Sequence, residues 1–583
     1  MVLPTREFIL DTLVSILIGA IVGVVVGLYG IVFESLGRFV ELVHAPHFRV
    51  LLGFISFAVT GYALYRIVGG FKGSSTDYFV ETYNFMYGRL NSRHVIVYVV
   101  FALLTVVGGG SVGPEGPALV MGGFIAYLLA CRLRRTPLED RYFTLIGGAA
   151  GISAVFRAPL TALSFGIEIP YRMDIESGIF VETLVACLTA YLVAVSIVGP
   201  QPLLLLGSTV KLMPTLNDIV IGIIAGVVSA SLSMLMIWVK QTSKNFSQLI
   251  IERLGKKSIV IAGIVGATLS LVGILLPGVS GAGTSEVEKL IETLKGREHV
   301  ERSPLDYMLT STFKTIFTPL TLTLGGTGGI FFPIIAIGVM FGYGLSSIIG
   351  LKNLADIEAL MAAMVAGLFA GTNKVVVSAI LFSLEVVGFG GLVPSALAAS
   401  TAYLLTINAG LINSQLSYRS SAKVVALLEI YERLKEEKNA ILETPAVKVA
   451  NKQVTTLHYK MTIADALKEI ENDLHIAYPV VDDYNRLIGY VELEDLLAME
   501  PNKRVYEIMR PAPTTLPDVS LSTIIEYLAR YGLERLFIID YDGKLVGILS
   551  KTDLLKFLLD AYTKEVVEGS VRGPPLHRKT ASD

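Results

Sequence analysis

The chain has 583 residues, of which 53% are hydrophobic and only 17% are charged, with a net charge of −2. Soluble domains carry nearer a quarter charged residues, so this composition indicates a protein that lies largely within a membrane. The near-neutral charge argues against a nucleic-acid partner, and two cysteines cannot form a disulfide framework.

Long apolar runs are predicted to cross a bilayer, because each is long enough to span its hydrocarbon core. They cover residues 8–35, 95–130, 218–240, 258–277, 320–349 and 376–407. The first run has no small-residue cleavage site, so we expect it to be retained rather than removed as a signal peptide. After about residue 420 the composition becomes that of a soluble protein. The sequence therefore predicts a multi-pass membrane protein with a soluble C-terminal region.

The glycine-rich stretch GGGSVGPEGPALVMGG (108–123) places one carboxylate, Glu115, at the N-terminal end of an apolar helix. Glycines allow backbone N–H groups to approach a ligand closely, and Pro117 suits the first helical turn. The N-terminal end of a helix is partly positive and attracts anions. The stretch therefore predicts an anion site, and Glu115, an ionisable residue at membrane depth, is its functional candidate.

The membrane region contains an internal repeat. Residues 148–168 resemble 365–385, GGTGGIFFP before Pro333 matches the glycines before Pro117, and 72–82 resemble 280–290. Repeats in transporters often meet at a midplane site where broken helices point at an anion. Whether the repeats are parallel or inverted is open from these matches alone. Glu168 and Glu385, at equivalent positions, are expected to pair with backbone or polar groups, whereas Asp77 is expected to face water.

The soluble region repeats as well, with matching residues 58 positions apart. The pairs are Asp482 with Asp540, Gly489 with Gly547, and Asp495 with Asp553. Each unit has the pattern strand, turn, strand, helix, which is typical of a small α+β module with an exposed cleft.

These motifs resemble the CLC family of chloride channels and chloride/proton antiporters, followed by a pair of CBS domains. GPEGP (113–117) is similar to the family's GREGP with Pro114 in place of Arg, GIFFP (329–333) matches GxFxP, and KGSSTD (72–77) stands where the family has GSGIP. The resemblance implies a polytopic α-helical fold of broken and tilted helices in inverted repeats, about 50–200 and 258–410. The implied domains are 1–420 for anion transport, a linker helix at 421–443, CBS domains at 444–501 and 504–563, and a disordered tail at 565–583.

The resemblance also implies a chloride site. Ser74, or Ser75 if the motif shifts by one residue, would offer a hydroxyl on the inner side, and Glu115 would be the gate that leaves when it is protonated or displaced. The rest of the implied set is Gly113, Gly329, and the backbone amides of Ile330 and Phe331. Chloride must be held weakly enough to leave, and amide dipoles with a hydroxyl do this better than a full positive charge.

Two positions depart from the family pattern. Ile169 stands where the family's antiporters have an inner proton-relay glutamate, and isoleucine cannot carry a proton. Ile412 stands at the family's inner tyrosine if Gln415 anchors the alignment, whereas Tyr418 is the alternative. Both departures favour channel-like or weakly proton-coupled flux of chloride and similar anions, and the alternative is a coupled chloride/proton antiporter.

The CBS resemblance implies a regulatory site for ATP or another adenine nucleotide. The pattern G-h-x-S/T-x-x-D of nucleotide-binding members is complete at 547–553, so Ser550 and Asp553 would hold the ribose, with Thr455, His475 and Ile476 near the adenine. The first module has Glu492 in place of the hydroxyl residue, so one competent site is expected. A purely structural dimerisation module is the alternative.

Other classes find less support. Seven scattered histidines have no metal-ligand spacing, no Walker motif indicates an ATP-driven pump, and no nucleophile–base pair indicates an enzyme. A nucleotide sensor whose membrane part is only an anchor would need neither the GPEGP nor the GIFFP motif, so the presence of both argues against that class. The resemblance implies a homodimer, surrounded by membrane lipid, in the plasma membrane of a prokaryote with its CBS domains in the cytoplasm.

Overall fold

The computed structural model describes most of the chain as two compact units, residues 1–416 and 417–583. The described residues are 6–43, 45–133, 137–199, 215–296, 302–386, 391–417, 427, 430–431, 434–435, 440–471, 475–530 and 533–567. Most of the predicted linker helix, the tail beyond 567, and Tyr418 lie outside them. Residues 565–567 were expected in the tail but belong to a helix that continues to Val567.

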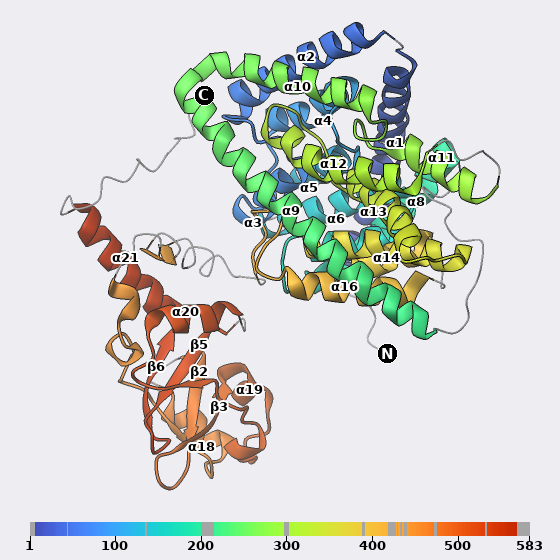
Figure 1. Ribbon diagram of the computed structural model, residues 1–583. Coiled ribbons are helices and arrows are strands. Elements are labelled where there is room, and N and C mark those ends of the chain that lie inside the picture. The colour runs from blue at the N-terminus through green and yellow to red at the C-terminus, as the bar shows by residue number, and fades with distance from the viewer. Residues whose placement is uncertain are drawn as a thin grey trace. The chain divides into compact units, whose positions relative to one another are not determined.

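The first unit is helical and polytopic, as predicted (Figure 1). Its α-helices are α1 (Arg6–Leu42), α2 (Pro46–Ala63), α3 (Ser75–Phe85), α4 (Ser92–Val107), α5 (Glu115–Arg132), α6 (Pro137–Phe156), α7 (Pro159–Glu168), α8 (Phe180–Val198), α9 (Leu216–Leu254), α10 (Ser258–Leu275), α11 (Thr284–Leu294), α12 (Pro304–Thr323), α13 (Phe331–Ile348), α14 (Leu354–Asn373), α15 (Val376–Val386) and α16 (Leu392–Leu405).

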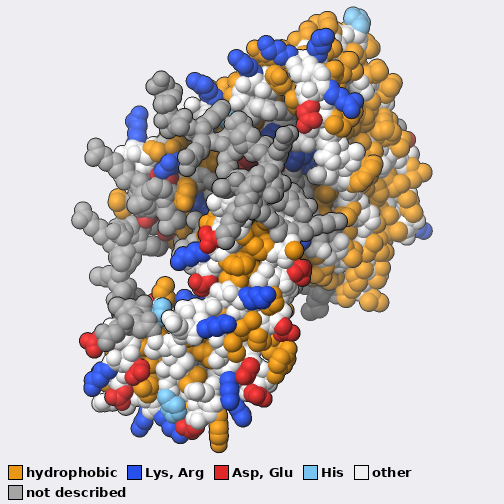
Figure 2. Space-filling view, turned by 90° about the vertical axis from the view of Figure 1, so that its left-hand side faces the viewer, with side chains coloured by type: hydrophobic (Ala, Val, Ile, Leu, Met, Phe, Trp, Pro, Cys, Tyr) orange, Lys and Arg blue, Asp and Glu red, His pale blue; other side chains and the backbone are white. Residues whose placement is uncertain are grey.

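Six of the described helical stretches are long and apolar enough to cross a membrane. They are Leu10–Val40, Pro46–Val68, Ser177–Val198, Leu216–Leu275, Phe331–Ile348 and Leu354–Asn373. Hydrophobic side chains cover much of the visible flank of this unit, whereas lysine, arginine and acidic side chains are interspersed over the second unit (Figure 2). This surface is the one expected of a protein embedded in lipid.

The two repeats are inverted, because their equivalent helices α7 and α15 run antiparallel. The glutamate at the end of each helix accepts two backbone amides at the start of the other, at distances of 2.8–3.0 Å. The amides belong to Val377 and Ser378 for Glu168, and to Leu160 and Thr161 for Glu385. The expectation that these glutamates pair with backbone groups is confirmed, and each satisfies N–H groups that a helix leaves unpaired.

Replacing either glutamate by glutamine should destabilise the membrane unit by about 1–3 kcal/mol, because a charged acceptor of several hydrogen bonds is lost. We expect Glu168→Gln and Glu385→Gln to have similar effects, since the two contacts are equivalent. Thermal unfolding in detergent measures this, with Glu252→Gln on the exposed face of α9 as the control. Melting temperatures indistinguishable from that of the control would contradict a stabilising role.

Glycines allow α5 and α6 to pack backbone against backbone. A Cβ atom built on Gly122 would collide with the carbonyl oxygen of Gly147 and would lie 3.2 Å from the backbone nitrogen of Gly151. Small residues at a membrane helix crossing allow such close approach. This crossing holds α5 in place, and Glu115 is the first residue of that helix.

The second unit contains two α+β modules, as the 58-residue repeat predicts. Each has a three-stranded sheet in which the first two strands are parallel and the last two antiparallel. The strands are β1 (Leu457–His458), β2 (Ala477–Val481) and β3 (Leu487–Glu492), then β4 (Thr514–Thr515), β5 (Arg535–Ile539) and β6 (Leu545–Ser550). The helices are α18 (Ile463–Glu469) and α19 (Leu493–Ala498), then α20 (Leu521–Arg530) and α21 (Lys551–Val567).

The two modules are joined by exchanged backbone pairs. Asn451, which lies in the first module before β1, exchanges two hydrogen bonds of 2.9 Å with Ile548 of β6. Arg510, which lies in the second module before β4, pairs in the same way with Tyr490 of β3 at 2.8 and 2.9 Å. A Cβ atom on Gly547 would lie 2.8 Å from the Asn451 carbonyl oxygen, so this glycine permits the close approach.

Candidate functional site

The starts of α5 and α13, one from each repeat, meet through a backbone bridge. Gly113 and Gly329 exchange two hydrogen bonds of 3.0 Å each, N–H to carbonyl oxygen in both directions. This bridge places the first turn of α5 directly against the first turn of α13. The structure thus brings together the two glycine-rich motifs that the sequence separates by more than two hundred residues.

The carboxylate of Glu115 lies at the N-terminus of α13 and is completely buried. Its Oε1 accepts the backbone amide of Phe331 at 2.5 Å and that of Phe332 at 3.4 Å. Its Oε2 is also buried, and no hydrogen-bond partner for it exists among the described residues. A negative group at this position is stabilised by the helix dipole and by N–H groups that would otherwise be unpaired. The place is therefore chemically suited to an anion.

Both bridge glycines leave room for this carboxylate. A Cβ atom on Gly113 would collide with Glu115 Oε2 and would lie 2.8 Å from the Cβ of Phe332. A Cβ atom on Gly329 would collide with Oε1 and would lie 2.6 Å from the nitrogen of Gly116. The sequence analysis did not predict that the Phe332 amide also contacts Glu115. Its position in the first turn of α13, where backbone N–H groups have no partner within the helix, could have indicated this.

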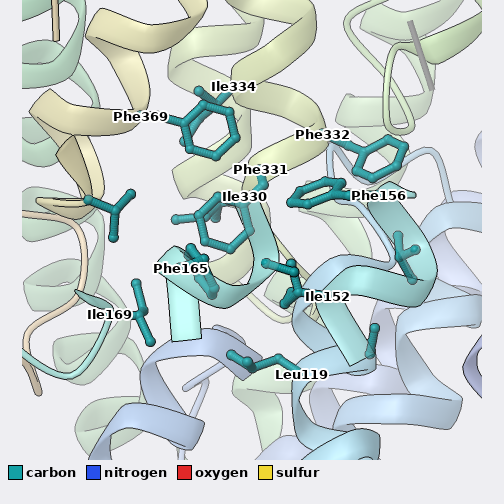
Figure 3. Packing of buried hydrophobic residues seen from close by; sticks show 14 of the residues in the cluster. Leu119, Ile152, Phe156, Phe165, Ile169, Ile330, Phe331, Phe332, Ile334 and Phe369 are labelled. Atoms are coloured by element: carbon teal, nitrogen blue, oxygen red, sulfur yellow. The ribbon is translucent and has the colours of Figure 1, made fainter. Parts of the chain in front are cut away.

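Aromatic rings enclose the start of α13 (Figure 3). Phe331 meets Phe165 edge to face at 4.8 Å and stacks on Phe369 at 5.4 Å, both between ring centroids. Phe332 stacks on Phe156 at 5.6 Å. The rings exclude water, and a hydrogen bond to an ion is stronger in such a low-dielectric place.

A cavity of about 700 Å³ adjoins the Glu115 turn, and Pro114 and Phe332 both line it. Its charged lining residues are the cations Arg38, Arg49, Arg157 and Lys289 and the acids Glu34, Glu286 and Glu288. Glu34 pairs with Arg38 at 2.7 Å, and Glu286 pairs with Lys289 at 2.9 Å. The cavity therefore ends beside the turn that carries Glu115, and both cations and acids line its wall.

The two candidate serines differ in how their hydroxyl groups are used. Ser74 precedes α3, and its Oγ accepts the amide of Asp77 at 3.2 Å, which leaves its own proton available to donate. Ser75 is buried, and its Oγ donates to the carbonyl oxygen of Gly328 at 2.9 Å. A serine has one proton to donate, so this geometry favours Ser74 as the anion ligand.

The segment that carries Ile412 is attached to α3 and α9 by a polar cluster. Asp77 accepts the amide and hydroxyl of Ser414 at 3.1 and 2.7 Å and pairs with Lys240 at 3.2 Å. Lys240 also donates to the carbonyl oxygen of Leu411. The expectation that Asp77 faces water is wrong, because its side chain is only 20% exposed and holds this segment.

The two departures from the family pattern are both fully buried. Ile412 lies in the apolar core of the membrane unit, two residues before Ser414. Ile169 follows α7, and its carbonyl oxygen accepts a hydrogen bond of 2.9 Å from the side-chain amide of Gln415. Gln415 thus links the residue after α7 to the segment that carries Ile412, whereas Tyr418 lies outside the described residues.

In the CBS pair, Ser550 and Asp553 contact each other at the start of α21. Asp553 Oδ2 accepts the hydroxyl and amide of Ser550 at 2.6 and 3.0 Å. At the equivalent place in the first module, Arg510 pairs with Asp495 at 2.8 Å and with Glu492 at 3.3 Å. The acid of the first module is therefore already occupied by a cation.

The residues predicted near the adenine belong to the first module. They are Thr455, His475 and Ile476. The side chain of Ile476 is 71% exposed. The amide of His475 donates to the Tyr478 hydroxyl at 2.6 Å. An exposed aliphatic side chain of this kind could cover one face of a planar base.

Two broken helices from inverted repeats, meeting at a buried carboxylate inside a polytopic membrane unit, define a membrane transporter with an anion site. Comparison with known families agrees: the family described as voltage gated chloride channel matches residues 57–406, and the CBS domain matches 446–501 and 505–560. The chain belongs to the CLC family of anion transporters and carries two C-terminal CBS domains.

Known relatives cover most of the membrane unit. The H(+)/Cl(-) exchange transporter ClcA of Salmonella arizonae is 26% identical over 391 residues, 60% of this chain and 78% of its own. A CLC-type fluoride/proton antiporter has a similar structure, with a TM-score of 0.60 at 24% identity over 72% of this chain and all of its own. A eukaryotic CLC transporter matches 94% of this chain and 99% of its own, with a TM-score of 0.57 at 16% identity.

Proposed function

We propose that this protein conducts chloride and similar anions through a pathway gated by Glu115, with channel-like or weakly proton-coupled flux. The observation that carries the proposal is the hydrogen bond from the Phe331 amide to the buried Glu115 carboxylate. The carboxylate occupies a helix N-terminus that would otherwise suit a free anion. Removing its charge by protonation weakens this contact and frees the place for chloride.

The buried Ile169 supports weak coupling, because no proton can be held at that side chain. The alternative, a coupled chloride/proton antiporter, is supported by the relatives that are named exchange transporters. The channel-like transporter and the coupled antiporter would both use Glu115 as the gate. They would differ in whether a proton can reach Glu115 from the side of the protein where Ile169 lies.

Chloride efflux from liposomes that contain the purified protein, with external pH recorded at the same time, tests this proposal. We expect chloride flux with little or no proton movement for each chloride. Stoichiometric movement of protons against their gradient would establish the antiporter instead. Absence of chloride flux from correctly reconstituted protein would overturn both.

The CBS pair is proposed to bind one adenine nucleotide at the Ser550–Asp553 end, on the cytoplasmic side of a prokaryotic plasma membrane. The ion pairs of Arg510 with Asp495 and Glu492 support a single site, because they occupy the corresponding place in the first module. Nucleotides are cytoplasmic ligands, which supports this orientation. A homodimer is also proposed, in which each subunit would conduct independently, and the described hydrogen bonds of Glu115 to Phe331 and Phe332 within one chain support this.

Replacing Asp553 by asparagine should weaken ATP binding by about tenfold or more, since a charged acceptor for the ribose hydroxyls is lost. The asparagine side-chain oxygen can still accept the Ser550 amide at the start of α21, so the fold should be kept. Asp495→Asn, 58 residues earlier, is the matched control and should leave affinity unchanged. Calorimetric titration of the full chain in detergent measures both, and equal losses in the two variants would contradict the single site.

A further inference from the structure

Five exposed cations lie where α2, α9 and α10 end. They belong to the π-helical turn Leu64–Val68 that follows α2, the loop after it, the last turn of α9, and the turn that leads into α10. The group consists of Arg66, Lys72, Arg253, Lys256 and Lys257, and we name it the basic end. None of the five side chains forms an ion pair or a hydrogen bond with another described residue.

The basic end is formed by helices that pack against each other. Helices α2 and α10 lie side by side (Figure 1) and run in opposite directions. A Cβ atom on Gly53 of α2 would lie 2.6 Å from the carbonyl oxygen of Gly266. A Cβ atom on Gly61, further along α2, would lie 2.9 Å from the Cβ of Ala262, which is earlier in α10. Small residues permit this close approach of membrane helices.

This packing brings the cations of different segments together. Arg66 lies five residues after the second of these α2 glycines, and Lys257 lies five residues before the α10 alanine, so both are at about the same level. The end of α9 is also nearby, since a Cβ atom on Gly70 would lie 4.0 Å from the Cδ1 of Ile251. Residues 62–72 contain no acid, and residues 250–258 contain only Glu252. The basic end is therefore a region of net positive charge.

The opposite end of the same helix pair has a different composition. Residues 275–283, which follow α10, and residues 42–48, where α2 begins, contain no lysine or arginine. Arg49 comes next in α2, but it is only partly exposed and lines the cavity. Lysines and arginines collect on the cytoplasmic side of membrane helices, where the leaflet is anionic. The basic end is thus the end of this pair that is expected to meet anionic headgroups.

Exposed apolar stripes lead along both helices to the basic end. Their side chains are between 44% and 53% exposed. The stripes consist of Leu51, Ile55, Val59 and Tyr62 on α2, and of Val260, Ile264 and Leu271 on α10. Arg66 follows the α2 stripe by four residues and Lys257 precedes the α10 stripe by three, so each cation is on the helix face of its stripe. Each helix thus presents an apolar face that ends in a cation.

A phospholipid has the matching order of groups, because its acyl chains end in a phosphate. Tyr62 lies one turn before Arg66, and exposed tyrosines are enriched at the level of the headgroups. A soluble anion would match the cations but not the apolar stripes, and an uncharged lipid would match only the stripes. We propose that the basic end binds the headgroup of an anionic phospholipid whose acyl chains lie on the exposed faces of α2 and α10. This inference does not depend on the function proposed for Glu115.

The test is the melting temperature of the purified full-length protein in detergent with added dioleoylphosphatidylglycerol or dioleoylphosphatidylcholine, which have the same acyl chains. A ligand that binds the folded protein stabilises it, so we expect a larger rise with phosphatidylglycerol. The double variant Arg66→Gln/Lys257→Gln should need about tenfold more phosphatidylglycerol for the same rise. The reason is that each cation near an anionic surface strengthens binding about fivefold.

The matched control is Lys295→Gln/Lys352→Gln, which removes two lysines from the turns after α11 and before α14 and should respond as the wild type does. An equal requirement for phosphatidylglycerol in both double variants overturns the proposal. So does an equal rise of the wild type with phosphatidylcholine, or with inorganic phosphate at the same concentration.

Salt dependence of the wild type decides if Arg66→Gln/Lys257→Gln does not fold. Screening weakens the attraction between exposed charges, so the rise with phosphatidylglycerol should shrink between about 50 mM and about 500 mM salt. A rise that is independent of salt would show that the apolar stripes alone bind the lipid, and the basic end would then have no part in it.

Discussion

Replacing Glu115 by alanine is expected to increase chloride flux at neutral pH by about tenfold or more, because the charged hydrogen bonds that hold the gate closed are removed. Wild-type flux should rise as pH falls, since protonation neutralises the carboxylate and releases it from the amides of Phe331 and Phe332. In Glu115→Ala this pH dependence should disappear. Flux from liposomes between pH 4 and pH 8, roughly the range of perturbed carboxyl groups, measures both effects.

The matched control for this variant is Glu34→Ala. Glu34 lines the same cavity as Pro114 and forms an ion pair with Arg38, whereas the amides of Phe331 and Phe332 donate to Glu115. We expect it to retain the pH dependence of the wild type. If Glu115→Ala also retains that dependence, the titrating gate is another group, and the assignment of Glu115 fails.

Replacing Gly122 by leucine should prevent stable folding of the membrane unit. The side chain would be forced into the backbone of α6 at Gly147, and overpacking of this size costs more than about 3 kcal/mol. Because α5 begins with Glu115, any surviving protein should also have a displaced gate. Size-exclusion profiles and melting temperatures in detergent measure the loss.

Gly30→Leu is the control for this substitution. Gly30 lies within a long membrane helix, α1, and a Cβ atom there would have no neighbour within 4 Å. It should therefore give a monodisperse protein with a melting temperature near that of the wild type. Equal damage from both substitutions would mean that leucine itself, rather than the α5–α6 crossing, is responsible.

Short motifs predicted the parts of the fold and site that depend on local backbone chemistry. The glycines around Glu115 and before Phe331 predict two helix N-termini, and the repeat predicts that they are equivalent. The same reasoning anticipated that Glu168 and Glu385 pair with backbone groups. The repeat alone could not show inversion, which follows only from the antiparallel contact of α7 and α15.

The remaining contacts depend on packing between distant segments, and no local pattern encodes them. Asp77 has the composition of an ordinary first-turn acid, but its partners Lys240 and Ser414 are 163 and 337 residues away. Glu176 lies in no recognisable sequence motif, and Tyr83, which donates a hydrogen bond to it, lies 93 residues earlier. Only the tertiary structure brings these groups together.

The exchange of carboxylates between α7 and α15 has a consequence for how the protein is made. The start of α7 is capped by Glu385, which the ribosome adds about 225 residues later. At ordinary rates of synthesis this interval is about 10–45 s. During that time the amides of Leu160 and Thr161 lack the carboxylate that accepts them in the folded protein. Neither half can reach its final form before the other has arrived.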